Sequence, residues 1–480
     1  MLPRLHCLVA LLLSLTLATP TLAGGDWTGK QVILKKPGVK IGSLDPAAKD
    51  VPPTELTRLT YRVLKEQAGS LLVRHNDVEG WFPKADAVVL DDAVDYFTKQ
   101  IQANPKNAPA LTRRAKAWQL KGELDIANKD YTEALKLDPT DSIPWSGRAS
   151  IWLGTKQFDK AIKDCDEAIR LDPKAAAAYN TRGLAHFQKR EFDKAVKDYD
   201  KAIQLEPTFA QAHSNRGFLW ANLQEYDKAI RDYDEALRCH PKFGNALNNR
   251  GLAWMAKKEH DKAIADFDEA IQLDDRFVSA YMNRGNAWLQ KMDLEKATKD
   301  FDKVIQIDPK FAGAYNSRGI ISSHKKDFDK AIEDFNEAIR LDPKYATAIG
   351  NRGLAWSHQK DLDKALKDYD EALRLNPKFA SAYNNRGLLW TAKKEYDKAI
   401  SDYSDAIRLQ PQYPNAYFNR GVAWTYKKDH DRAIKDFDEA IRLNPKAVNY
   451  YVLRADSLKT KGNWDAAIKD YTEAVRLEPF

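Results

Sequence analysis

The sequence predicts a mainly α-helical solenoid of about eleven helix pairs, preceded by a small β-barrel. Three observations support this fold class: a proline recurs every 34 residues, two amphipathic helical stretches fall within each period, and residues 25–90 lack the period. A fixed period of about 20–50 residues is typical of stacked repeats, in which each unit buries its apolar face only against its neighbours. The prolines of the period are Pro105, Pro139, Pro173, Pro207, Pro241, Pro309, Pro343, Pro377, Pro411, Pro445 and Pro479, with Asp275 in the same register.

The composition argues against a nucleic-acid-binding protein. The 480 residues are 30% charged and 43% hydrophobic, and the net charge of +7 is small for this length. Lys and Asp alternate along the repeats, as at Asp227, Lys228 and Asp232, so both signs are mixed over a solvated surface. Because nucleic acid requires a concentrated basic surface, which the sequence does not provide, we expect no nucleic-acid partner.

Residues 1–23 have the features of a signal peptide. Arg4 supplies a positive start, Cys7 to Ala18 form an apolar run, and residues 21–23 are mostly small before a cleavage point at Gly24. The apolar run is shorter than the roughly 20 residues that span a bilayer, so cleavage is favoured over anchoring. We therefore expect an exported protein, periplasmic or secreted, without a membrane span after cleavage.

Residues 25–90 predict the β-barrel. Short β-rich runs alternate with turn-forming Pro-Gly, Asn-Asp and single Gly residues. Five strands of this length and spacing are typical of a small barrel. The runs are Val32–Leu34, Val39–Ile41, Leu59–Leu64, Leu71–Val73 and Ala87–Leu90.

Two segments of this region resemble the final strands of bacterial SH3-like domains. They are Gly69–Val73 and Glu79–Pro83, and they cover only a small part of the chain. The resemblance implies an SH3-like module, of a kind that often binds cell-wall or peptide ligands. Trp81 is open to two interpretations, a core residue or a flat surface for a ligand.

The period begins with half a repeat at residues 91–107. Ala93, Phe97 and Ile101 have helical spacing, and Pro105 ends the segment. We expect a single helix that covers the open end of the array, since solenoids need an atypical end unit. Eleven repeats of 34 residues follow over residues 108–480, and positions within a repeat are counted from its first residue. The repeats start at residues 108, 142, 176, 210, 244, 278, 312, 346, 380, 414 and 448.

Residues 380–413 show how one repeat encodes two helices. In the first helix, Tyr383, Gly387 and Trp390 fall on one stripe at i, i+4 and i+7. Pro411 ends the second helix, because proline lacks an amide hydrogen and disfavours helical backbone in the residue before it. The apolar stripe of the second helix is Ala399, Tyr403 and Ala406.

This pattern of Gly, Tyr or Phe, Ala and Pro resembles the tetratricopeptide repeat signature over about 370 residues. The resemblance implies a right-handed superhelix whose first helices line a concave groove that binds proteins. The chain departs from the signature at position 7, which is Arg, and at position 11, which is usually Trp. We expect the tryptophans to pack between the helices rather than to stack on ligands. They are Trp118, Trp152, Trp220, Trp254, Trp288, Trp356, Trp390 and Trp424.

Positions 7 and 23 predict a repeated ion pair, here called the Arg–Asp ladder. Position 7 lies on the stripe that faces the second helix, and a partly buried guanidinium needs a carboxylate beside it. We interpret the pairs as structural; the alternative is an anion-binding ribbon for acidic ligands. The arginines are Arg114, Arg148, Arg182, Arg216, Arg250, Arg284, Arg318, Arg352, Arg386, Arg420 and Arg454. The aspartates are Asp130, Asp164, Asp198, Asp232, Asp266, Asp300, Asp334, Asp368, Asp402, Asp436 and Asp470.

A row of asparagines on the opposite face of the first helices is the predicted binding site. An amide side chain offers both a donor and an acceptor, as a peptide backbone does. Since packed helices repeat at ~8–10 Å and an extended chain advances ~3.3 Å per residue, one asparagine would meet about every third ligand residue. Position 6 contributes Asn215, Asn249, Asn283, Asn351, Asn385 and Asn419, with Thr181 and Ser317 in the same row. Position 5 adds Asn180, Asn248, Asn316 and Asn384 beside them.

The row is similar to the asparagine ladder in the repeat domain of O-GlcNAc transferases, which implies an extended peptide ligand. The alternative is that the asparagines hold water or bond to the next helix. The face lacks the lysines that related proteins use to bind a C-terminal carboxylate, so a neutral, extended segment fits better. The expected partners are therefore proteins or extended peptides.

The sequence shows no catalytic constellation, so we expect no enzyme, cofactor or metal site. His324 and His358 share a repeat position, but neither has carboxylate or thiol company of the kind that holds a metal. The alternative function is a structural scaffold of a cell-envelope complex, which uses the outer face and the chain ends. The last repeat stops at Phe480 without a covering helix, and this predicts weak end-to-end self-association.

Overall fold

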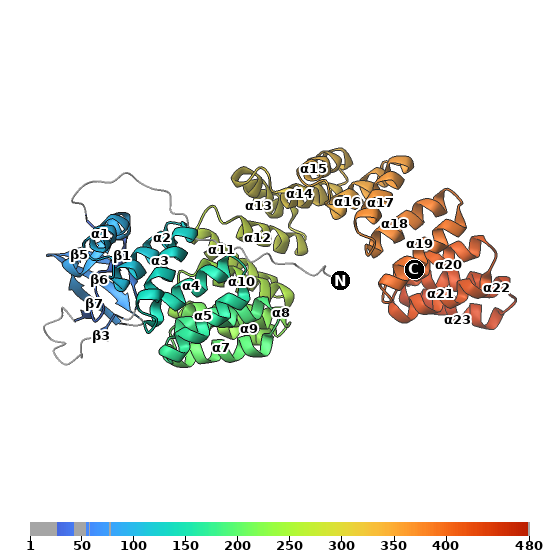
Figure 1. The fold of residues 1–480 in the computed structure, drawn as a ribbon. Coiled ribbons are helices and arrows are strands. Elements are labelled where there is room, and N and C mark those ends of the chain that lie inside the picture. Colours follow the sequence, from blue (N-terminus) through green and yellow to red (C-terminus); the bar gives the residue numbers. More distant parts are fainter. Residues whose placement is uncertain (1–25, 43–53, 57, 76–77, 479–480) are drawn as a thin grey trace. The chain divides into compact units, whose positions relative to one another are not determined.

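The computed structural model describes residues 26–42, 54–56, 58–75 and 78–478. The expected signal peptide lies outside these residues. The chain divides into two compact units at Leu273 and Asp274, and each is described by itself. The described part of the first unit holds a β region and helices α1–α11, and the second holds α12–α23 (Figure 1).

The β region contains eight short strands among the described residues, three more than the five runs that the sequence suggested. They form three antiparallel sheets with the orders β4–β1–β8, β2–β3 and β5–β6–β7. β3 and β5 are only two or three residues long and mostly polar, so hydrophobic alternation did not reveal them. The strands are β1 (Gln31–Leu34), β2 (Lys40–Ile41), β3 (Thr54–Glu55), β4 (Thr60–Arg62), β5 (Lys65–Gln67), β6 (Ser70–His75), β7 (Val78–Pro83) and β8 (Ala87–Val89), with the 3-10 turn η1 (Lys84–Asp86) before β8.

Strand β1 divides its side chains between two cores. Val32 and Leu34 point into the β region, where they pack with Leu71 and Phe82. Ile33, on the opposite face of the strand as the period of two requires, is 0% exposed and packs against the first helices. The β region is therefore attached to the helices through a shared strand. Trp81 is half-buried.

One helix precedes the pairs, as the half-repeat predicts: α1 (Leu90–Ala103). Phe97 on α1 is 0% exposed and packs with Ile33 of β1 and Ala117 of the next helix. Arg113, also on that helix and only 5% exposed, donates from Nε to the carbonyl oxygen of Leu34 at 2.9 Å. These contacts bind β1, α1 and the first repeat into one packed cluster.

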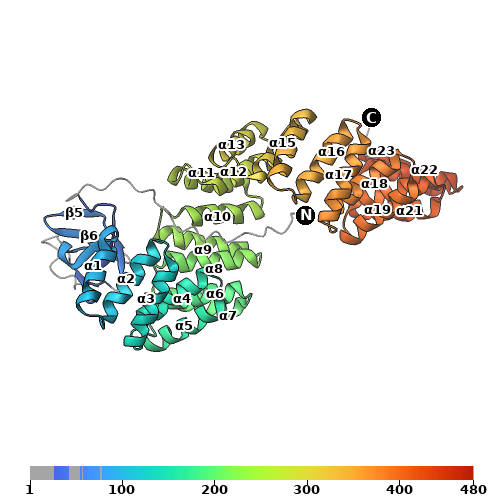
Figure 2. The ribbon, with the colours of Figure 1, turned by 45° about the horizontal axis from the view of Figure 1, so that its top comes forward.

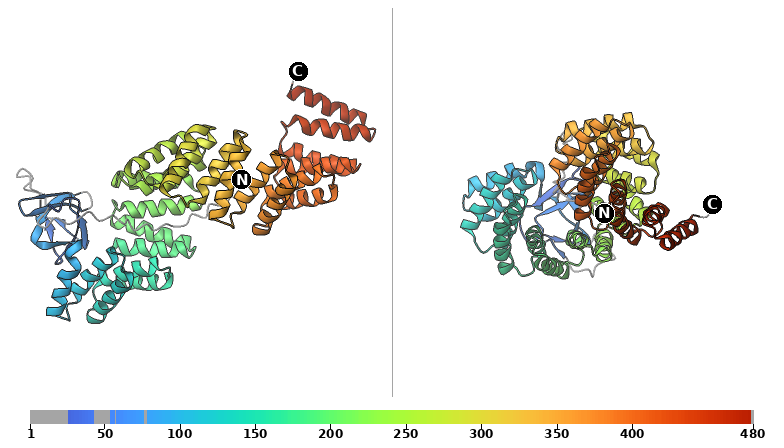
Figure 3. Two further views of the ribbon diagram at one scale, coloured as in Figure 1. Left: turned by 90° about the horizontal axis from the view of Figure 1, so that it is seen from above. Right: turned by 90° about the vertical axis from the view of Figure 1, so that its right-hand side faces the viewer.

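Eleven helix pairs follow, and within each unit successive pairs stack side by side (Figure 2; Figure 3). The first helices are α2 (Ala108–Leu120), α4 (Ser142–Gly154), α6 (Ala176–Gln188), α8 (Ala210–Asn222), α10 (Gly244–Ala256), α12 (Val278–Gln290), α14 (Ala312–His324), α16 (Ala346–His358), α18 (Ala380–Ala392), α20 (Pro414–Tyr426) and α22 (Val448–Thr460). The second helices are α3 (Leu124–Leu137), α5 (Phe158–Leu171), α7 (Phe192–Leu205), α9 (Tyr226–Cys239), α11 (His260–Leu273), α13 (Leu294–Ile307), α15 (Phe328–Leu341), α17 (Leu362–Leu375), α19 (Tyr396–Leu409), α21 (His430–Leu443) and α23 (Trp464–Leu477). None of the described helices is long and apolar enough to span a bilayer.

Glycine at position 8 lets the two helices of a repeat approach closely. A Cβ atom added to Gly251 would lie 2.5 Å from Cε1 of Phe267, the buried aromatic residue at position 24 of the same repeat. The second repeat solves the same contact differently, because Ala149 stands at position 8 and the smaller Cys165 at position 24, both 0% exposed. Repeats 1 and 11 combine alanine at position 8 (Ala115 and Ala455) with tyrosine at position 24 (Tyr131 and Tyr471), so the close approach does not depend on glycine in every repeat.

The turn between the two helices requires left-handed backbone at position 15. Lys326 there has φ 61°, and Gly462 has φ 80° at the same position of the last repeat. The first and last repeats place glycine at this position, whereas the nine repeats between them place a residue with a Cβ atom. Left-handed backbone costs such residues about 1–2 kcal/mol.

Candidate functional site

Each arginine of the Arg–Asp ladder binds its aspartate through two hydrogen bonds. In repeat 5, Arg250 donates from Nε and Nη2 to Asp266 at 2.9 and 2.6 Å. The aspartate side chain is 7% exposed and that of the arginine 21%. The same two-point contact recurs in every repeat. The carboxylates satisfy the guanidinium groups, which leaves little capacity for an anionic ligand.

The third nitrogen of the guanidinium connects neighbouring repeats. Nη1 of Arg250 donates to Asp234 of repeat 4 at 2.6 Å, so one arginine holds three helices together. Position 25 of the preceding repeat supplies the acceptor in each contact of this kind. The carboxylate contacts are Arg182–Asp166, Arg216–Asp200, Arg250–Asp234, Arg318–Asp302, Arg386–Asp370 and Arg454–Asp438. Asn336 and Ser404 take the same role for Arg352 and Arg420.

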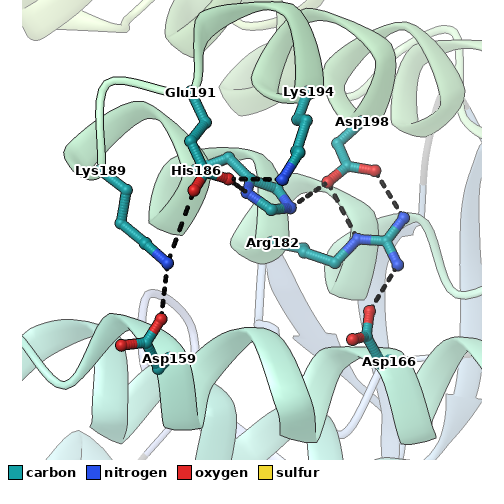
Figure 4. Close-up of polar contacts among 8 residues, drawn as sticks. All are labelled: Asp159, Asp166, Arg182, His186, Lys189, Glu191, Lys194 and Asp198. Carbon is teal, nitrogen blue, oxygen red and sulfur yellow. Dashed lines mark hydrogen bonds and ion pairs between the residues drawn. The ribbon is translucent and has the colours of Figure 1, made fainter.

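Repeat 3 departs from this arrangement at position 11, where His186 replaces tryptophan (Figure 4). Nδ1 of His186 lies 2.7 Å from Glu191, and Nε2 lies 3.9 Å from the ladder residue Asp198. Hydrogen bonds from Lys194 and from His186 lower the pKa of the Glu191 carboxyl to about 2. Asp198 in turn raises the pKa of the Arg182 guanidinium above its ordinary value through its hydrogen bonds. Every group in this cluster has a charged partner, so we assign it a structural role.

The tryptophans at position 11 are half-buried rather than enclosed. Trp390 packs against the buried Tyr403 and Ala399 of its own repeat. The ammonium of Lys398 lies 4.7 Å from the centre of its ring, which is a cation–π contact. The same contact recurs with Lys160, Lys228, Lys262, Lys296, Lys364 and Arg432 over the corresponding tryptophans. The tryptophan rings therefore make contacts within the protein, to the second helix and to a Lys or Arg side chain.

The face formed by positions 2, 6, 9 and 13 of the first helices from α4 to α20 is here called the first-helix face; the same positions of α2 and α22 carry Arg113, Lys116 and Asp456 and are not part of it. Its position-6 asparagines are half-buried, and the position-9 side chains Leu354 and Leu388 are 39% and 44% exposed. Each even-numbered helix from α4 to α20 contains a single charged residue (Asp, Glu, Lys or Arg), and this residue is the arginine at position 7. Since the ladder uses that arginine, the first-helix face is uncharged in a chain that is 30% charged.

The position-5 asparagines do not lie where the sequence suggested. They were expected to line the binding surface, but Asn180, Asn248, Asn316 and Asn384 are only 4–7% exposed. The reason is the helical geometry, since position 5 turns toward the neighbouring repeat rather than toward solvent. Their side chains bond to other asparagines instead.

Asparagines of adjacent repeats bond to each other across the interface. Nδ2 of Asn351 donates to Oδ1 of Asn316 at 3.0 Å, and Nδ2 of Asn419 donates to Oδ1 of Asn384 at 2.9 Å. Asn215 and Asn180 form the same contact at 2.9 Å. In each pair the two residues are 35 apart, which combines the repeat length with the step from position 5 to position 6. That spacing is a signal in the sequence that reasoning from single positions missed.

The histidines and the other metal-ligating residue types were also compared with the geometry of a metal site. The described residues contain no group of three or more His, Cys, Asp and Glu side chains placed to hold a metal. His358 stacks on the ring of Phe328 at 4.8 Å, and so fills a packing role.

Comparison with known sequences identifies the repeated unit. Three profiles described as tetratricopeptide repeat match most of the region after residue 112. The first matches residues 176–209, 278–311, 312–345 and 414–447, the second 113–176, 219–276 and 354–414, and the third 448–480. No curated protein matches the sequence significantly.

Several solved structures resemble the chain at low sequence identity. Yeast Tom70 is 18% identical with a TM-score of 0.42, and the match covers 78% of this chain and 93% of that one. The Cut9–Hcn1 hetero-tetramer of the APC/C is 14% identical with a TM-score of 0.46, over 81% and 90%. A tetratricopeptide repeat protein from Parabacteroides merdae is 16% identical with a TM-score of 0.44, over 52% and 98%.

Proposed function

Because this chain belongs to the tetratricopeptide repeat family, whose members typically mediate protein–protein interactions, we propose that it binds extended, uncharged polypeptide segments. The observation that carries the proposal is the uncharged first-helix face with its row of position-6 amides. The protein is then a binding module rather than an enzyme.

The absence of charge on this face limits what it binds well. A charged ligand side chain buried there would lose its hydration without gaining an opposite charge, which is costly. The backbone of an extended peptide is uncharged and presents N–H and C=O groups at regular intervals. Half-buried asparagines such as Asn351 and Asn419 have a carbonyl oxygen left for such a partner, because their contacts to the preceding repeat use Nδ2.

Aliphatic side chains between the amides favour a ligand with apolar residues. Leu354 and Leu388 occupy position 9 of successive repeats and expose 39% and 44% of their surface. Burial of an exposed leucine yields about 25 cal/mol for each Å² of apolar area removed from water. The amides would fix the ligand backbone, and the leucines would favour apolar side chains.

A selection experiment tests the proposal. A library of twelve-residue peptides without Asp, Glu, Lys and Arg is selected on the mature chain, and the affinity of the best binder is measured by fluorescence anisotropy. Replacement of Asn351 and Asn419 by Ala removes up to two hydrogen bonds of about 1 kcal/mol each. The expected loss is therefore about thirtyfold in Kd.

Matched controls separate the site from the chain as a whole. Asn376→Ala and Asn444→Ala remove amides of the same chemistry at the ends of α17 and α21, and should leave the affinity unchanged. Substitution of lysine or aspartate into the selected peptide should weaken binding. If the library yields no binder, or the variant with both asparagines replaced binds as well as the parent, the proposal is wrong.

We also propose that the protein acts outside the cytoplasm after removal of residues 1–23. The support is the pattern of the N-terminal sequence alone. Expression of the full chain in a bacterial host, followed by fractionation and intact-mass measurement, tests this. A chain that begins at Gly24 in the periplasm or medium supports export, whereas a cytoplasmic chain that retains Met1 contradicts it.

A second candidate function is assembly through α23. Trp464, Ile468 and Val475 are 58%, 61% and 50% exposed and lie on one stripe of this helix. Two copies that pair these stripes would bury them mutually, which favours weak self-association. Light scattering over a concentration series should show a dimer that Ile468→Lys abolishes and Leu273→Lys, at a 38% exposed position on α11, does not. A strict monomer at all concentrations would exclude this candidate.

A further inference from the structure

We propose that the buried asparagines at position 5 are positioning residues, which fix the amides of the following repeat with the carbonyl oxygen toward the ligand. The inference rests on the proposed function and deepens it. It assigns the binding face a hydrogen-bond acceptor in repeats 8 and 10, and so a requirement for ligand N–H groups at that interval.

The first step is the burial of the position-5 side chain. Asn316 is 5% exposed and Asn384 is 4% exposed, so water has little access to either amide. A buried carbonyl oxygen needs a donor, because an unsatisfied polar group in the interior is costly. Nδ2 of Asn419 supplies that donor to Asn384 at 2.9 Å.

The second step is the orientation that this bond imposes. An asparagine amide rotated by half a turn exchanges its NH₂ group and its oxygen. If Asn419 alone rotated in this way, two carbonyl oxygens would face each other at hydrogen-bond distance. Asn384 cannot rotate to compensate without losing its own bond from Nδ2 to Oδ1 of Asn385 at 3.3 Å. The amide of Asn419 is therefore held with Nδ2 toward the protein, which leaves Oδ1 as the free group. Asn351 donates from Nδ2 to Asn316 in the same way, at 3.0 Å.

The third step is the alternation along the array. Position 5 is asparagine in repeats 3, 5, 7 and 9, whereas the even-numbered repeats between and after them have Ser214, Met282, Gly350 and Phe418. In repeat 9 the position-6 oxygen is itself engaged, since Nδ2 of Asn384 donates to Oδ1 of Asn385 at 3.3 Å. Asn248 and Asn249 form the same contact in repeat 5 at 3.4 Å. The outward-facing oxygens of Asn215, Asn351 and Asn419 consequently belong to even-numbered repeats.

This alternation sets an interval in the ligand. Two repeats advance ~16–20 Å if neighbouring first helices lie ~8–10 Å apart. An extended chain covers that distance in about five to six residues. A bound peptide would thus donate one N–H to Asn351 and another, five or six residues along, to Asn419. Both asparagines lie in the second unit.

Backbone methylation of a selected peptide tests the interval. The probe is the uncharged twelve-residue peptide chosen on the mature chain, whose non-repeating sequence gives one register. Each of its amide nitrogens is methylated in turn, which removes one N–H and no other polar group. Two positions five or six residues apart should each lose about fivefold in affinity, the effect of one hydrogen bond.

Variants at position 5 then distinguish positioning from simple stability. Asn384→Met places a residue that repeat 6 already accommodates at this position (Met282), and so should fold; thermal unfolding verifies this. In this variant, methylation at one of the two sensitive positions should lower the affinity of the peptide by less than twofold. Methylation at the other position, which depends on Asn316, should still lower the affinity about fivefold. Asn384→Asp keeps the acceptor oxygen and should restore the original pattern. Met282→Leu is the control without any effect on the pattern.

The outcomes separate the two proposals. If the peptide binds but its methylation profile is flat, or if Asn384→Met leaves the profile unaltered, the positioning role is wrong and peptide binding stands. If no peptide of the library binds, both proposals fail.

Discussion

Arg250 and Asp266 form a two-point ion pair between the two helices of repeat 5, with distances of 2.9 and 2.6 Å. The remaining Nη1 of the arginine reaches Asp234 of the previous repeat. The two carboxylates differ greatly in exposure, at 7% for the Asp266 side chain and 52% for Asp234. One guanidinium thus joins a buried contact within a repeat to an exposed contact between repeats.

The two aspartates should contribute very differently to stability. Asp266→Ala leaves the guanidinium without its buried partner and should lower the free energy of unfolding by about 3 kcal/mol, as for other broken buried pairs. Asp234→Ala removes an exposed partner and should cost less than about 1 kcal/mol. Chemical denaturation of both variants measures this. Equal, small effects would show that the ladder is dispensable within the repeat.

The packing of glycine against an aromatic ring predicts a compensating pair. Gly251→Ala places a Cβ atom 2.5 Å from Cε1 of Phe267 and should destabilise the protein by about 1–3 kcal/mol. Combination with Phe267→Cys reproduces the Ala149 and Cys165 pair of repeat 2. The double variant should then be more stable than the sum of the two single effects by at least about 0.5 kcal/mol, as for residues in contact. Strict additivity in a double-mutant cycle would contradict the shared-space explanation.

Left-handed backbone at position 15 offers a stabilising substitution. Lys326→Gly removes a Cβ atom from a residue at φ 61° and should raise the free energy of unfolding by about 0.5–1 kcal/mol, because the relief of strain exceeds the added freedom of the unfolded chain. The neighbouring Lys325 has φ −76°, so Lys325→Gly should instead destabilise. Melting temperatures of the two variants should move in opposite directions. A shared direction would rule out the backbone as the cause.

The cluster around His186 predicts a contribution to acid stability (Figure 4). The pKa of Glu191 falls from its ordinary 4.5 to about 2 in the folded protein, chiefly through Lys194 and then His186. A carboxyl with a depressed folded pKa stabilises the fold above its unfolded pKa and loses this effect as pH falls from about 4.5 to about 2. Glu191→Gln should flatten the loss of stability in that window, and Lys194→Met should do so in part. An unaltered acid unfolding curve for Glu191→Gln would contradict the assignment.

Much of the fold could be predicted from sequence because the same pattern of residues recurs in eleven repeats. The prolines gave the period, and the spacing of Gly, aromatic and Ala residues gave both helices of each pair. The short polar strands β3 and β5 carry no such signal, since two or three residues cannot show alternation. β3 pairs with β2, which lies more than ten residues earlier, whereas β5 forms a tight hairpin with the next strand, β6.

The binding face was harder to predict, because its key contacts cross from one repeat to the next. Asn316 and Asn351 look like two independent members of a row when repeats are aligned position by position. Only the helical rotation that turns position 5 inward shows that one residue holds the other. A search for pairs at a separation of 35 would have found Asn180 with Asn215, and Asn384 with Asn419.

Strand β1 contributes side chains to two cores, and this limits how the protein can be divided into separate domains. Ile33 belongs to the helical core while Val32 and Leu34 belong to the β region, so no flexible linker separates the two. Deletion of the β region would remove a buried side chain from the first helices and the carbonyl that holds Arg113. The β region is therefore not an independent domain beside the repeats. A chimeric protein that receives this β region would also have to receive α1 and α2.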